Sequence, residues 1–377
     1  MRRHSVGCRL GIQPDTRSSG LNTCRHGLIV MITLLFAAVA SAGTIRVPED
    51  VLSIQHAIDS AKAGDVIDVG PGRWLEQIDL RGKSILIRGR DGAVKTIIDA
   101  TGLGDSVVRC ITAEGPGTVL EGLTLTGGTG HVGTHGAEIA LGGGLLALGA
   151  SPTLRDCILT NNHVNRNGGG AYCGKGGDVR FERCMFKGNS AEKGAGLLSV
   201  SSRPVLLDCT FIDNKASYSG GGLFAAKGSG PVLRGCRFET NRAAYQGGGV
   251  CSLESAGEVL DCKFERNRAG ARGGAMYLGF RTSMTASACA FSTTTDSVVG
   301  NDQVARAAYR VGGCDLGASV CVQAEEVDCL AAGGRYRGDG SICSKSDATQ
   351  VARRGGDLNN DGAVDRTDLA ILMLLWR

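Results

Sequence analysis

The sequence has little proline, few aromatic residues and no large excess of charge. Only 7 of its 377 residues are proline, and its glycines follow no strict G-X-Y period, which together exclude a collagen. Aromatic residues amount to 5%, yet 42% of the residues are hydrophobic, which is enough to build a core and argues against wholesale disorder. The apolar run Leu28–Ala40 is too short to span a bilayer.

The N-terminal residues have the composition of an export signal. Five arginines precede or flank the start of the apolar run, and Ala40-Ser41-Ala42 follows it as an A-x-A cleavage site. We therefore expect residues 1–42 to be a signal peptide and the mature protein, starting at Gly43, to be secreted or held at the cell surface without a transmembrane segment. Removal of the leader lowers the net charge from +4 to 0. The mature chain therefore lacks the excess of basic charge typical of nucleic-acid binding, and we expect no nucleic-acid partner.

Glycine is abundant, with 59 residues, and much of it belongs to an internal repeat. The repeat is marked by cysteines that recur about every 26 residues, each preceded by an apolar residue at −3 and followed by Leu or Phe at +2. The first five are followed by asparagine at +5 and by glycine seven positions beyond that. The repeat cysteines are Cys157, Cys184, Cys209, Cys236, Cys262 and Cys289, and the asparagines are Asn162, Asn189, Asn214, Asn241 and Asn267.

Each repeat reads as strand, turn and strand, and predicts one coil of a parallel β-solenoid. The Cys and +2 positions share one face of a strand, a bend before the cysteine returns the −3 residue to the interior, and the asparagine marks a turn. One coil cannot stand alone, so neighbouring coils must share a core, with equivalent residues stacked about 4.8 Å apart. The cysteine column then acts either as a buried apolar filler or as a series of disulfides.

The frame C-x-F-x-x-N followed by G-G-G/A, as in CTFIDNKASYSGGGL, resembles the repeats of polymorphic outer-membrane-type β-helix proteins. These belong to the pectate-lyase-like superfamily, and the resemblance covers residues 152–292. The upstream segment TIRVPEDVLSIQHAIDSAKAGDVIDVGPGRW resembles the cap and first coils of the same superfamily. The resemblance implies an all-β, right-handed parallel β-helix over residues 43–300. We expect an amphipathic capping helix over Ile54–Ala61 that Gly64 ends, and strands at Val66–Val69, Ser84–Arg88 and Thr96–Asp99.

One coil is longer than the others. Leu123 takes the place of the repeat cysteine, but the interval from Leu123 to Cys157 is longer than the repeat, so a loop is inserted between them. The insert carries His131, His135 and Glu138, whose spacing would gather metal ligands on one face of a helix. The glycines around them favour a solvated loop over a zinc or copper site.

The residue before each repeat cysteine is expected to point outward. Polysaccharide lyases of the superfamily use outward acids, Ca²⁺ and a basic residue on one face, so the resemblance makes Asp156, Arg183 and Asp208 the candidate catalytic residues. Asp156 and Asp208 would lie two coils, or about 9.6 Å, apart, which is too far for a retaining carboxylate pair. A solvated ladder of ions is the alternative.

Residues 301–344 form a segment of different character, with four cysteines in a short stretch. In an exported chain these predict two disulfides in a small module, with three possible pairings, and zinc is the alternative. The segment resembles the short Cys-rich modules near the C-termini of secreted bacterial β-helix and dockerin proteins. The four are Cys314, Cys321, Cys329 and Cys343.

Residues 345–377 contain DLNNDGAVDRTDL, which has the spacing of a calcium loop. Oxygen ligands at positions 1, 3, 5, 7 and 12 suit Ca²⁺, and a glycine at position 6 makes the turn. Asp followed by Leu at the end of the loop resembles a type I dockerin repeat, which implies a cohesin-like partner, although dockerins carry two such repeats and one is found. The expected ligands are Asp357, Asn359, Asp361, Ala363 through its carbonyl, and Asp368.

Two functions follow from these features. Regular repeats, a neutral charge and the lack of a complete catalytic motif favour a β-helix scaffold that binds a polysaccharide, a cell-surface glycan or a protein partner. The superfamily and the dockerin-like tail imply the alternative, a polysaccharide lyase or glycoside hydrolase. A third interpretation is an assembly component recruited through the calcium module.

Overall fold

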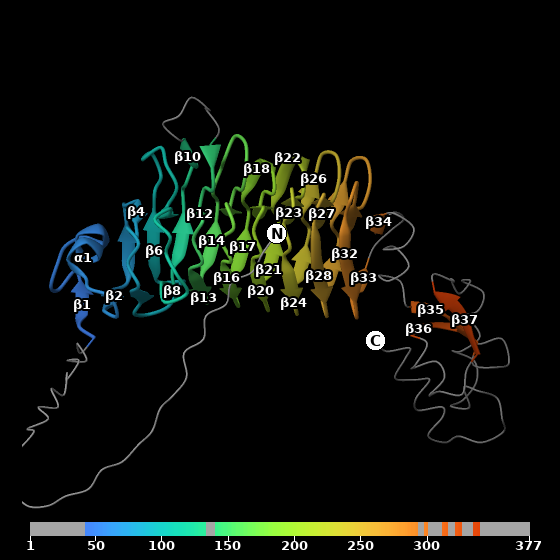
Figure 1. The fold of residues 1–377 in the computed structure, drawn as a ribbon, viewed down its shortest axis with the longest axis horizontal. Helices are drawn as coiled ribbons and strands as arrows, with labels where there is room; N and C mark the ends of the chain where they lie inside the picture. The colour runs from blue at the N-terminus through green and yellow to red at the C-terminus, as the bar shows by residue number, and fades with distance from the viewer. Residues whose placement is uncertain are drawn as a thin grey trace, which may run out of the picture. The chain divides into compact units, whose positions relative to one another are not determined.

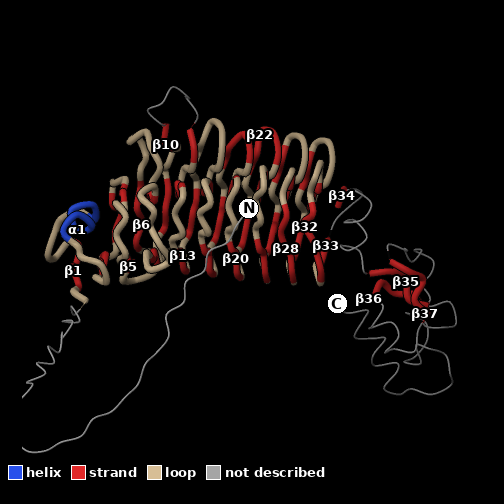
Figure 2. Tube along the Cα trace, viewed as in Figure 1, coloured by secondary structure: helices blue, strands red, loops and turns tan. Residues whose placement is uncertain are grey.

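The computed structural model describes residues 42–132, 140–292, 298–300, 311–315, 321–325 and 335–339 (Figures 1 and 2). The chain divides into two units, Met1–Ser41 and Ala42–Arg377. The expected leader, apart from Ala42, lies outside the described residues. So do the expected calcium ligands Asp357, Asn359, Asp361, Ala363 and Asp368.

The chain winds into stacked coils, each of which contributes a strand to three parallel sheets (Figure 1). Sheet 1 has ten strands, and its neighbours pair in parallel register. Its strands are β1 (Thr44–Val47), β2 (Val66–Val69), β5 (Leu86–Gly89), β8 (Val119–Glu121), β13 (Thr153–Arg155), β16 (Arg180–Glu182), β20 (Val205–Leu207), β24 (Val232–Arg234), β28 (Ala256–Leu260) and β32 (Ser283–Ser287).

Sheets 2 and 3 have nine strands each. Sheet 2 contains β3 (Gly72–Trp74), β6 (Thr96–Asp99), β9 (Thr124–Thr126), β14 (Ile158–Thr160), β17 (Met185–Lys187), β21 (Thr210–Ile212), β25 (Arg237–Glu239), β29 (Lys263–Glu265) and β33 (Ala290–Ser292). Sheet 3 contains β4 (Ile78–Asp79), β7 (Val108–Cys110), β12 (Leu145–Leu148), β15 (Ala171–Gly174), β19 (Leu197–Val200), β23 (Leu223–Ala226), β27 (Val250–Leu253), β31 (Met276–Leu278) and β34 (Val298–Gly300).

Three smaller sheets complete the described strands. Sheet 4, between sheets 2 and 3 in each of four coils, contains the parallel strands β18 (Ser190–Lys193), β22 (Lys215–Ser219), β26 (Arg242–Ala243) and β30 (Arg268–Ala269). In the predicted insert, β10 (His131–Val132) and β11 (Ala140–Leu141) form an antiparallel pair. Near the C-terminus an antiparallel sheet consists of β35 (Val311–Asp315), β36 (Cys321–Glu325) and β37 (Arg335–Asp339).

The register confirms the predicted parallel solenoid and its repeat. Leu154, Phe181 and Leu206 pair on consecutive strands of sheet 1, each one coil after the last. The longer coil is also confirmed, because Leu154 pairs with Leu120, which precedes it by more than one ordinary repeat. A coil nevertheless has three or four strands rather than the two that the repeat predicted, because its glycine-rich half also pairs with its neighbours in sheets 3 and 4.

The predicted bend before each cysteine is one residue long. Asp156, Arg183, Asp208 and Asp261 have φ between 50° and 52° there, and the chain passes through this left-handed residue from sheet 1 to sheet 2. The next turn lies at the asparagine, as predicted, but the asparagine is not its left-handed residue. The left-handed residue is the one before it, such as Asp213 with φ 54°, because the asparagine side chain turns inward to bond to neighbouring coils.

The interior consists of columns of identical residues. Phe186, Phe211, Phe238 and Phe264 are fully buried, and successive rings stack with centroids 4.4 to 4.8 Å apart. The repeat cysteines lie beside them as free thiols, which confirms the apolar-filler interpretation and shows that the disulfide alternative for this column is wrong. Burial raises the pKa of the Cys157 and Cys184 thiols, as expected for inert interior cysteines.

The N-terminal helix is α1 (Ile54–Ser60), and it packs against β1, β2 and β4 at the first coils of the stack (Figure 1). The Ser53 side chain accepts a hydrogen bond from the His56 N–H at 3.0 Å and caps its first turn. The helix ends at Ser60, and Ala61 is already extended, so Gly64 does not end it. Strands β2 and β6 match their expected bounds, and β5 begins two residues later than expected.

Candidate functional site

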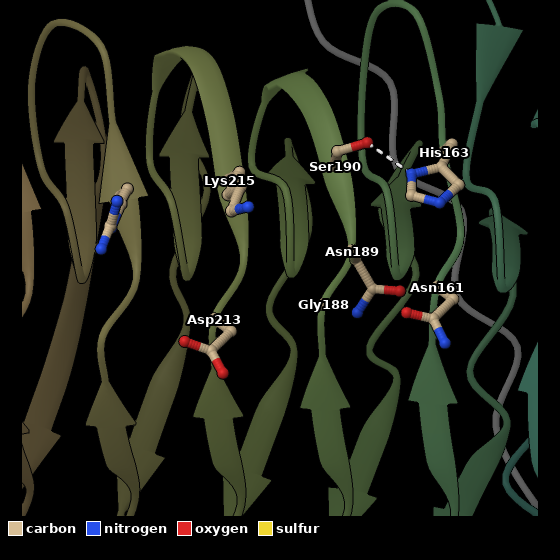
Figure 3. Close-up of a pocket in the computed structure, with 8 residues that line it drawn as sticks. Asn161, His163, Gly188, Asn189, Ser190, Asp213 and Lys215 are labelled. Atoms are coloured by element: carbon tan, nitrogen blue, oxygen red, sulfur yellow. Dashed lines mark hydrogen bonds between the residues drawn. The ribbon is translucent and has the colours of Figure 1, made fainter.

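A polar hollow opens where each coil leaves sheet 2 and enters sheet 4 (Figure 3). Its volume is about 570 Å³, and a second hollow of about 390 Å³ continues from it across sheet 4 and shares Ser190 and Lys215 with it. We call the two together the polar groove. The first hollow is lined by Asn161, His163, Gly188, Asn189, Ser190, Asp213, Lys215 and Arg242.

The asparagine column holds the backbone beneath this groove. The Oδ1 of Asn214 accepts hydrogen bonds from both the backbone N–H and the Nδ2 of Asn189, at 3.1 and 3.0 Å. The Nδ2 of Asn214 in turn donates to the Phe186 carbonyl at 2.9 Å. The same bonds recur from coil to coil, and the side chains of Asn162, Asn189, Asn214 and Asn241 are fully buried. The ladder fixes the residues on either side of each asparagine, which point outward.

The residues directly after these asparagines form one outward column, which we call the basic column. Strand pairing places His163 beside Ser190, Ser190 beside Lys215, Lys215 beside Arg242, and Arg242 beside Arg268. Three consecutive coils therefore present a cation at the same position. Because parallel strands lie about 4.8 Å apart, the cations follow one another at about that interval along the stack.

Few charges oppose this column. Within the described part of the chain, neither Lys215 nor Arg242 forms an ion pair. Asp213, the acid that lines the first hollow, accepts a hydrogen bond from the Thr240 hydroxyl at 2.6 Å. Like charges on directly paired strand positions destabilise a sheet, so the basic column costs stability unless an anion lies over it.

The other polar groups of the groove offer hydrogen bonds. His163 lies with its Nδ1 at 2.7 Å from the Ser190 hydroxyl, and both side chains face the hollow in Figure 3. Further along strand β22, Tyr218 stacks on Tyr245 of the next coil with ring centroids 5.3 Å apart. Both tyrosines keep 44 to 45% of their surface exposed, so strand β22 carries both the cation Lys215 and an aromatic ring, and the second ring lies just beyond β26.

The predicted catalytic residues lie elsewhere, at the corner between sheets 1 and 2. The structure brings Asp156 and Arg183 together, with the Arg183 Nε and Nη2 donating to the two carboxylate oxygens of Asp156 at 2.8 and 2.7 Å. This bidentate hydrogen bond lowers the pKa of Asp156 from its usual value. Asp208 lies one coil beyond Arg183, at the same exposed corner position, and its carboxylate has no ion pair within the described residues.

The predicted metal ligands of the insert are only partly described. The Nδ1 of His131 lies 2.9 Å from an Asp105 oxygen, and Asp105 also accepts from Arg109 at 2.9 Å. His135 and Glu138 lie outside the described residues. Within the described ranges no three His, Cys, Asp or Glu side chains converge as metal ligands would.

The Cys-rich module is described through its backbone. Cys314 lies in β35 and Cys321 in β36, and these strands pair antiparallel, with Asp315 opposite Cys321. Cys329 and Cys343 lie outside the described residues. The two predicted disulfides stay a prediction.

The basic column was missed from the sequence although its signal is present. Lys215, Arg242 and Arg268 each stand six positions after a repeat cysteine, and Ser190 and His163 occupy the same phase. Since the five positions hold four different residue types, they do not appear as a uniform position of the repeat. Only the register shows that its three cations are neighbours.

Comparison with known proteins agrees with this architecture. Residues 110–291 match a family model described as the right-handed β-helix region. No curated protein sequence matches the chain. Among the described residues, no helix is both long enough and apolar enough to pass through a membrane.

Solved structures similar to the chain include a pectin methylesterase from carrot, with 15% identity and a TM-score of 0.39 over 72% of this chain and 91% of the other. A pectin methylesterase from Aspergillus niger has 11% identity and a TM-score of 0.36 over 69% and 90%. An alginate lyase from Paenibacillus sp. str. FPU-7 has 12% identity and a TM-score of 0.32 over 69% and 98%. The family match and the parallel register identify residues 110–291 as a right-handed parallel β-helix.

Proposed function

We propose that this protein is a carbohydrate-binding β-helix scaffold whose polar groove binds an acidic polysaccharide. The observation that carries the proposal is the basic column, in which Lys215, Arg242 and Arg268 follow one another on paired strands. Neither Lys215 nor Arg242 has an acidic partner within the described residues. A polymer with one carboxylate per sugar would neutralise several of these cations at once.

A chain that crosses several coils gains affinity from repetition. Each exposed ion pair contributes little by itself, but linked contacts act at high effective concentration, so weak sites combine. Tyr218 in β22 and Tyr245 just beyond β26 present stacked aromatic surface, on which a pyranose ring can pack. The polar hollow around His163 and Ser190 offers hydrogen bonds to hydroxyl groups.

Binding without cleavage agrees better with the groove than catalysis does. Glycoside hydrolysis needs a pair of carboxyl groups, and Asp213 is the single acid among the residues that line the two hollows. The alternative of a polysaccharide-degrading enzyme depends on Asp156, Arg183 and Asp208. In that set, Asp156 and Arg183 are bound to each other.

The proposal includes export to the cell surface or medium and a calcium-binding tail. The basic leader with its A-x-A site supports export, and the spacing of Asp357, Asn359 and Asp361 supports calcium binding. Ca²⁺ titration of the full chain by calorimetry should show a binding heat that is lost in Asp361→Ala and kept in Asp347→Ala. An absence of heat in the wild type would refute the calcium loop and its cohesin-like partner.

The groove is tested by measuring the affinity of the purified chain for polygalacturonate, with a neutral glucan as the reference polymer. We expect tight binding of polygalacturonate at low salt, weakening as salt rises. Lys215→Gln/Arg242→Gln should weaken binding by about tenfold or more, since about 1 kcal/mol is lost for each of two cations.

A matched control changes the same charge outside the groove. Lys175→Gln/Arg203→Gln alters two exposed cations in the turns between sheets 3 and 1, and it should leave the affinity within about twofold. Equal loss in both double variants would mean that general basicity, and not the basic column, binds the polymer. Release of new sugar ends during the incubation would favour the enzyme alternative.

A further inference from the structure

The outer face of sheet 3 has an unusual polarity. Strand residues alternate between the interior and the outside, and an exposed sheet face is normally polar. Here the outward positions hold apolar side chains, while inward Ser199 and Ser252 are polar and fully buried. The outward Leu198, Phe224 and Cys251 form an apolar cluster separate from the core, with at most 4% of their surface exposed.

The first outward column of this face is covered by the chain itself. Left-handed glycines in the turn between sheets 4 and 3 pack directly against this column. A Cβ on Gly194, for example, would lie 2.8 Å from the Leu198 Cβ. A Cβ on Gly220 would lie 2.6 Å from that of Phe224. The second outward column is not covered in this way, and its residues Val200 and Ala226 are half-buried.

A hollow exists where the second column has small residues. On consecutive strands that column holds Leu148, Gly174, Val200, Ala226 and Leu253, so leucines stand at both ends and smaller side chains lie between them. The resulting cavity has a volume of about 200 Å³. It is lined by Asn167, Tyr172, Lys193, Leu198, Val200, Phe224, Ala226 and Lys227.

The Tyr172 ring forms one wall of this cavity. It lies along the strand over Gly174, where an added Cβ would come within 2.7 Å of the ring atom Cε1. An added side chain at this position would have to displace the ring, so glycine lets the Tyr172 ring lie over the strand. An aromatic wall and an aliphatic floor favour a flat apolar ligand.

The rim of the cavity is basic. Lys227 projects from a left-handed turn residue with φ 51° and forms no ion pair within the described residues. On the other side, the Lys193 Nζ lies 3.7 Å from a Glu192 oxygen, while Glu192 also pairs with Arg166 at 3.0 Å. No acid lines the cavity within the described part of the chain, so Lys227 has no counter-charge there, whereas the Lys193 Nζ also lies near Glu192 and 5.3 Å from the centroid of the Tyr218 ring.

We propose that this cavity is a second binding site, separate from the polar groove, for a small aromatic carboxylate. The flat ring of the ligand would pack between Tyr172 and Ala226, and its carboxylate would reach Lys193 or Lys227 at the rim. Apolar contact supplies the affinity for the ring, and charge-assisted hydrogen bonds at the rim select an anion.

The test is calorimetric titration of the full chain with cinnamate, and with cinnamyl alcohol as an uncharged analogue of the same shape. We expect saturable binding of cinnamate at one site, with a dissociation constant at or below about 1 mM. The alcohol should bind at least about fivefold more weakly because it lacks the charge. No saturable heat with cinnamate, or equal affinity for both probes, would overturn the proposal.

Two variants separate the cavity from its rim. Ala226→Phe fills the hollow and should abolish cinnamate binding, while polygalacturonate binding in the polar groove stays unchanged. Lys227→Met lies on the surface, leaves the hollow open, and should weaken cinnamate binding by about five- to tenfold. Lys175→Met makes the same change at a left-handed residue of an earlier turn and should have no effect.

Undiminished cinnamate binding in Ala226→Phe would place the ligand elsewhere and refute the site. If Ala226→Phe does not fold, Lys227→Met against Lys175→Met decides the question, since both residues are exposed. Equal weakening in those two variants would show that the cavity rim has no special role. Failure of cinnamate binding alongside normal polygalacturonate binding would leave the function proposed for the polar groove intact.

Discussion

The interior and the exterior of the same coils follow different rules. Inside, one residue type repeats from coil to coil, as the phenylalanine stack from Phe186 to Phe264 and the asparagine ladder show. Outside, one position after the asparagine, the side chain changes from serine to lysine to arginine on successive strands. Interior slots need like shapes to stack and continuous hydrogen bonds, whereas exterior positions are free to carry function.

The largest effect is expected from breaking the phenylalanine stack. Phe211→Ala removes a fully buried ring that stacks on Phe186 and Phe238, and it should lower the free energy of unfolding by about 3–5 kcal/mol. Urea denaturation followed by circular dichroism measures the loss. Phe280→Ala is the matched exterior control, because that ring is 65% exposed, and its unfolding free energy should hardly change.

The second-largest loss of stability is expected from breaking the asparagine ladder. Asn214→Ala leaves the N–H and Nδ2 of Asn189 and the carbonyl of Phe186 without their partners, and we expect a loss of about 2–3 kcal/mol in the same assay. The exposed Asn165→Ala should cost less than about 0.5 kcal/mol. Similar losses in the two variants would contradict the difference between buried and exposed asparagines.

An acid-dependent effect is expected at the edge of the core, at Asp68. Burial alone would raise the pKa of this carboxyl, but hydrogen bonds from Arg90 and Arg88 outweigh it and hold the pKa below its usual value. Its contribution is therefore present above the unfolded pKa of about 3.9 and is lost as the pH falls through the lower folded pKa.

Asp68→Asn should lower stability at pH 7 by about 1 kcal/mol and flatten the decline of stability as the pH falls below about 4. Unfolding free energies of the wild type and the variant across that pH range provide the measurement. Parallel pH profiles would show that the ion pairs of Asp68 make no pH-dependent contribution.

The smallest effect should come from the exterior ion pair of Asp156 and Arg183. Both side chains are about half exposed, 50% and 54%, so water and salt screen their attraction despite the bidentate geometry. Asp156→Asn, which removes the charge but still tolerates the left-handed backbone, should leave the urea midpoint unchanged within error. A marked drop in the urea midpoint would mean that this exposed corner stabilises the coil stack as the buried columns do.

The interior was predictable from the sequence because the buried positions hold the same residue type in successive repeats. The Cys, Phe and Asn positions of the repeat are uniform, so their periodicity alone placed them in stacked coils. The left-handed turn residues were only half predicted, since Asp156, Arg183 and Gly235 meet one backbone requirement with unrelated side chains.

The exterior sites could not be read from the repeat for a similar reason. The basic column combines His163, Ser190, Lys215 and Arg242, whose only common property is their phase. The apolar cavity depends on a local decrease in side-chain size at Gly174 and Ala226, which becomes visible only once the register aligns the strands.

The central claim, that interior columns build the coil stack and an exterior column binds, is tested most directly in one double variant. Lys215→Gln/Arg242→Gln should weaken polygalacturonate binding by about tenfold or more while its free energy of unfolding stays equal to or above that of the wild type, because two stacked like charges are removed. Unchanged affinity, or a loss of stability that accounts for the lost binding, would contradict it.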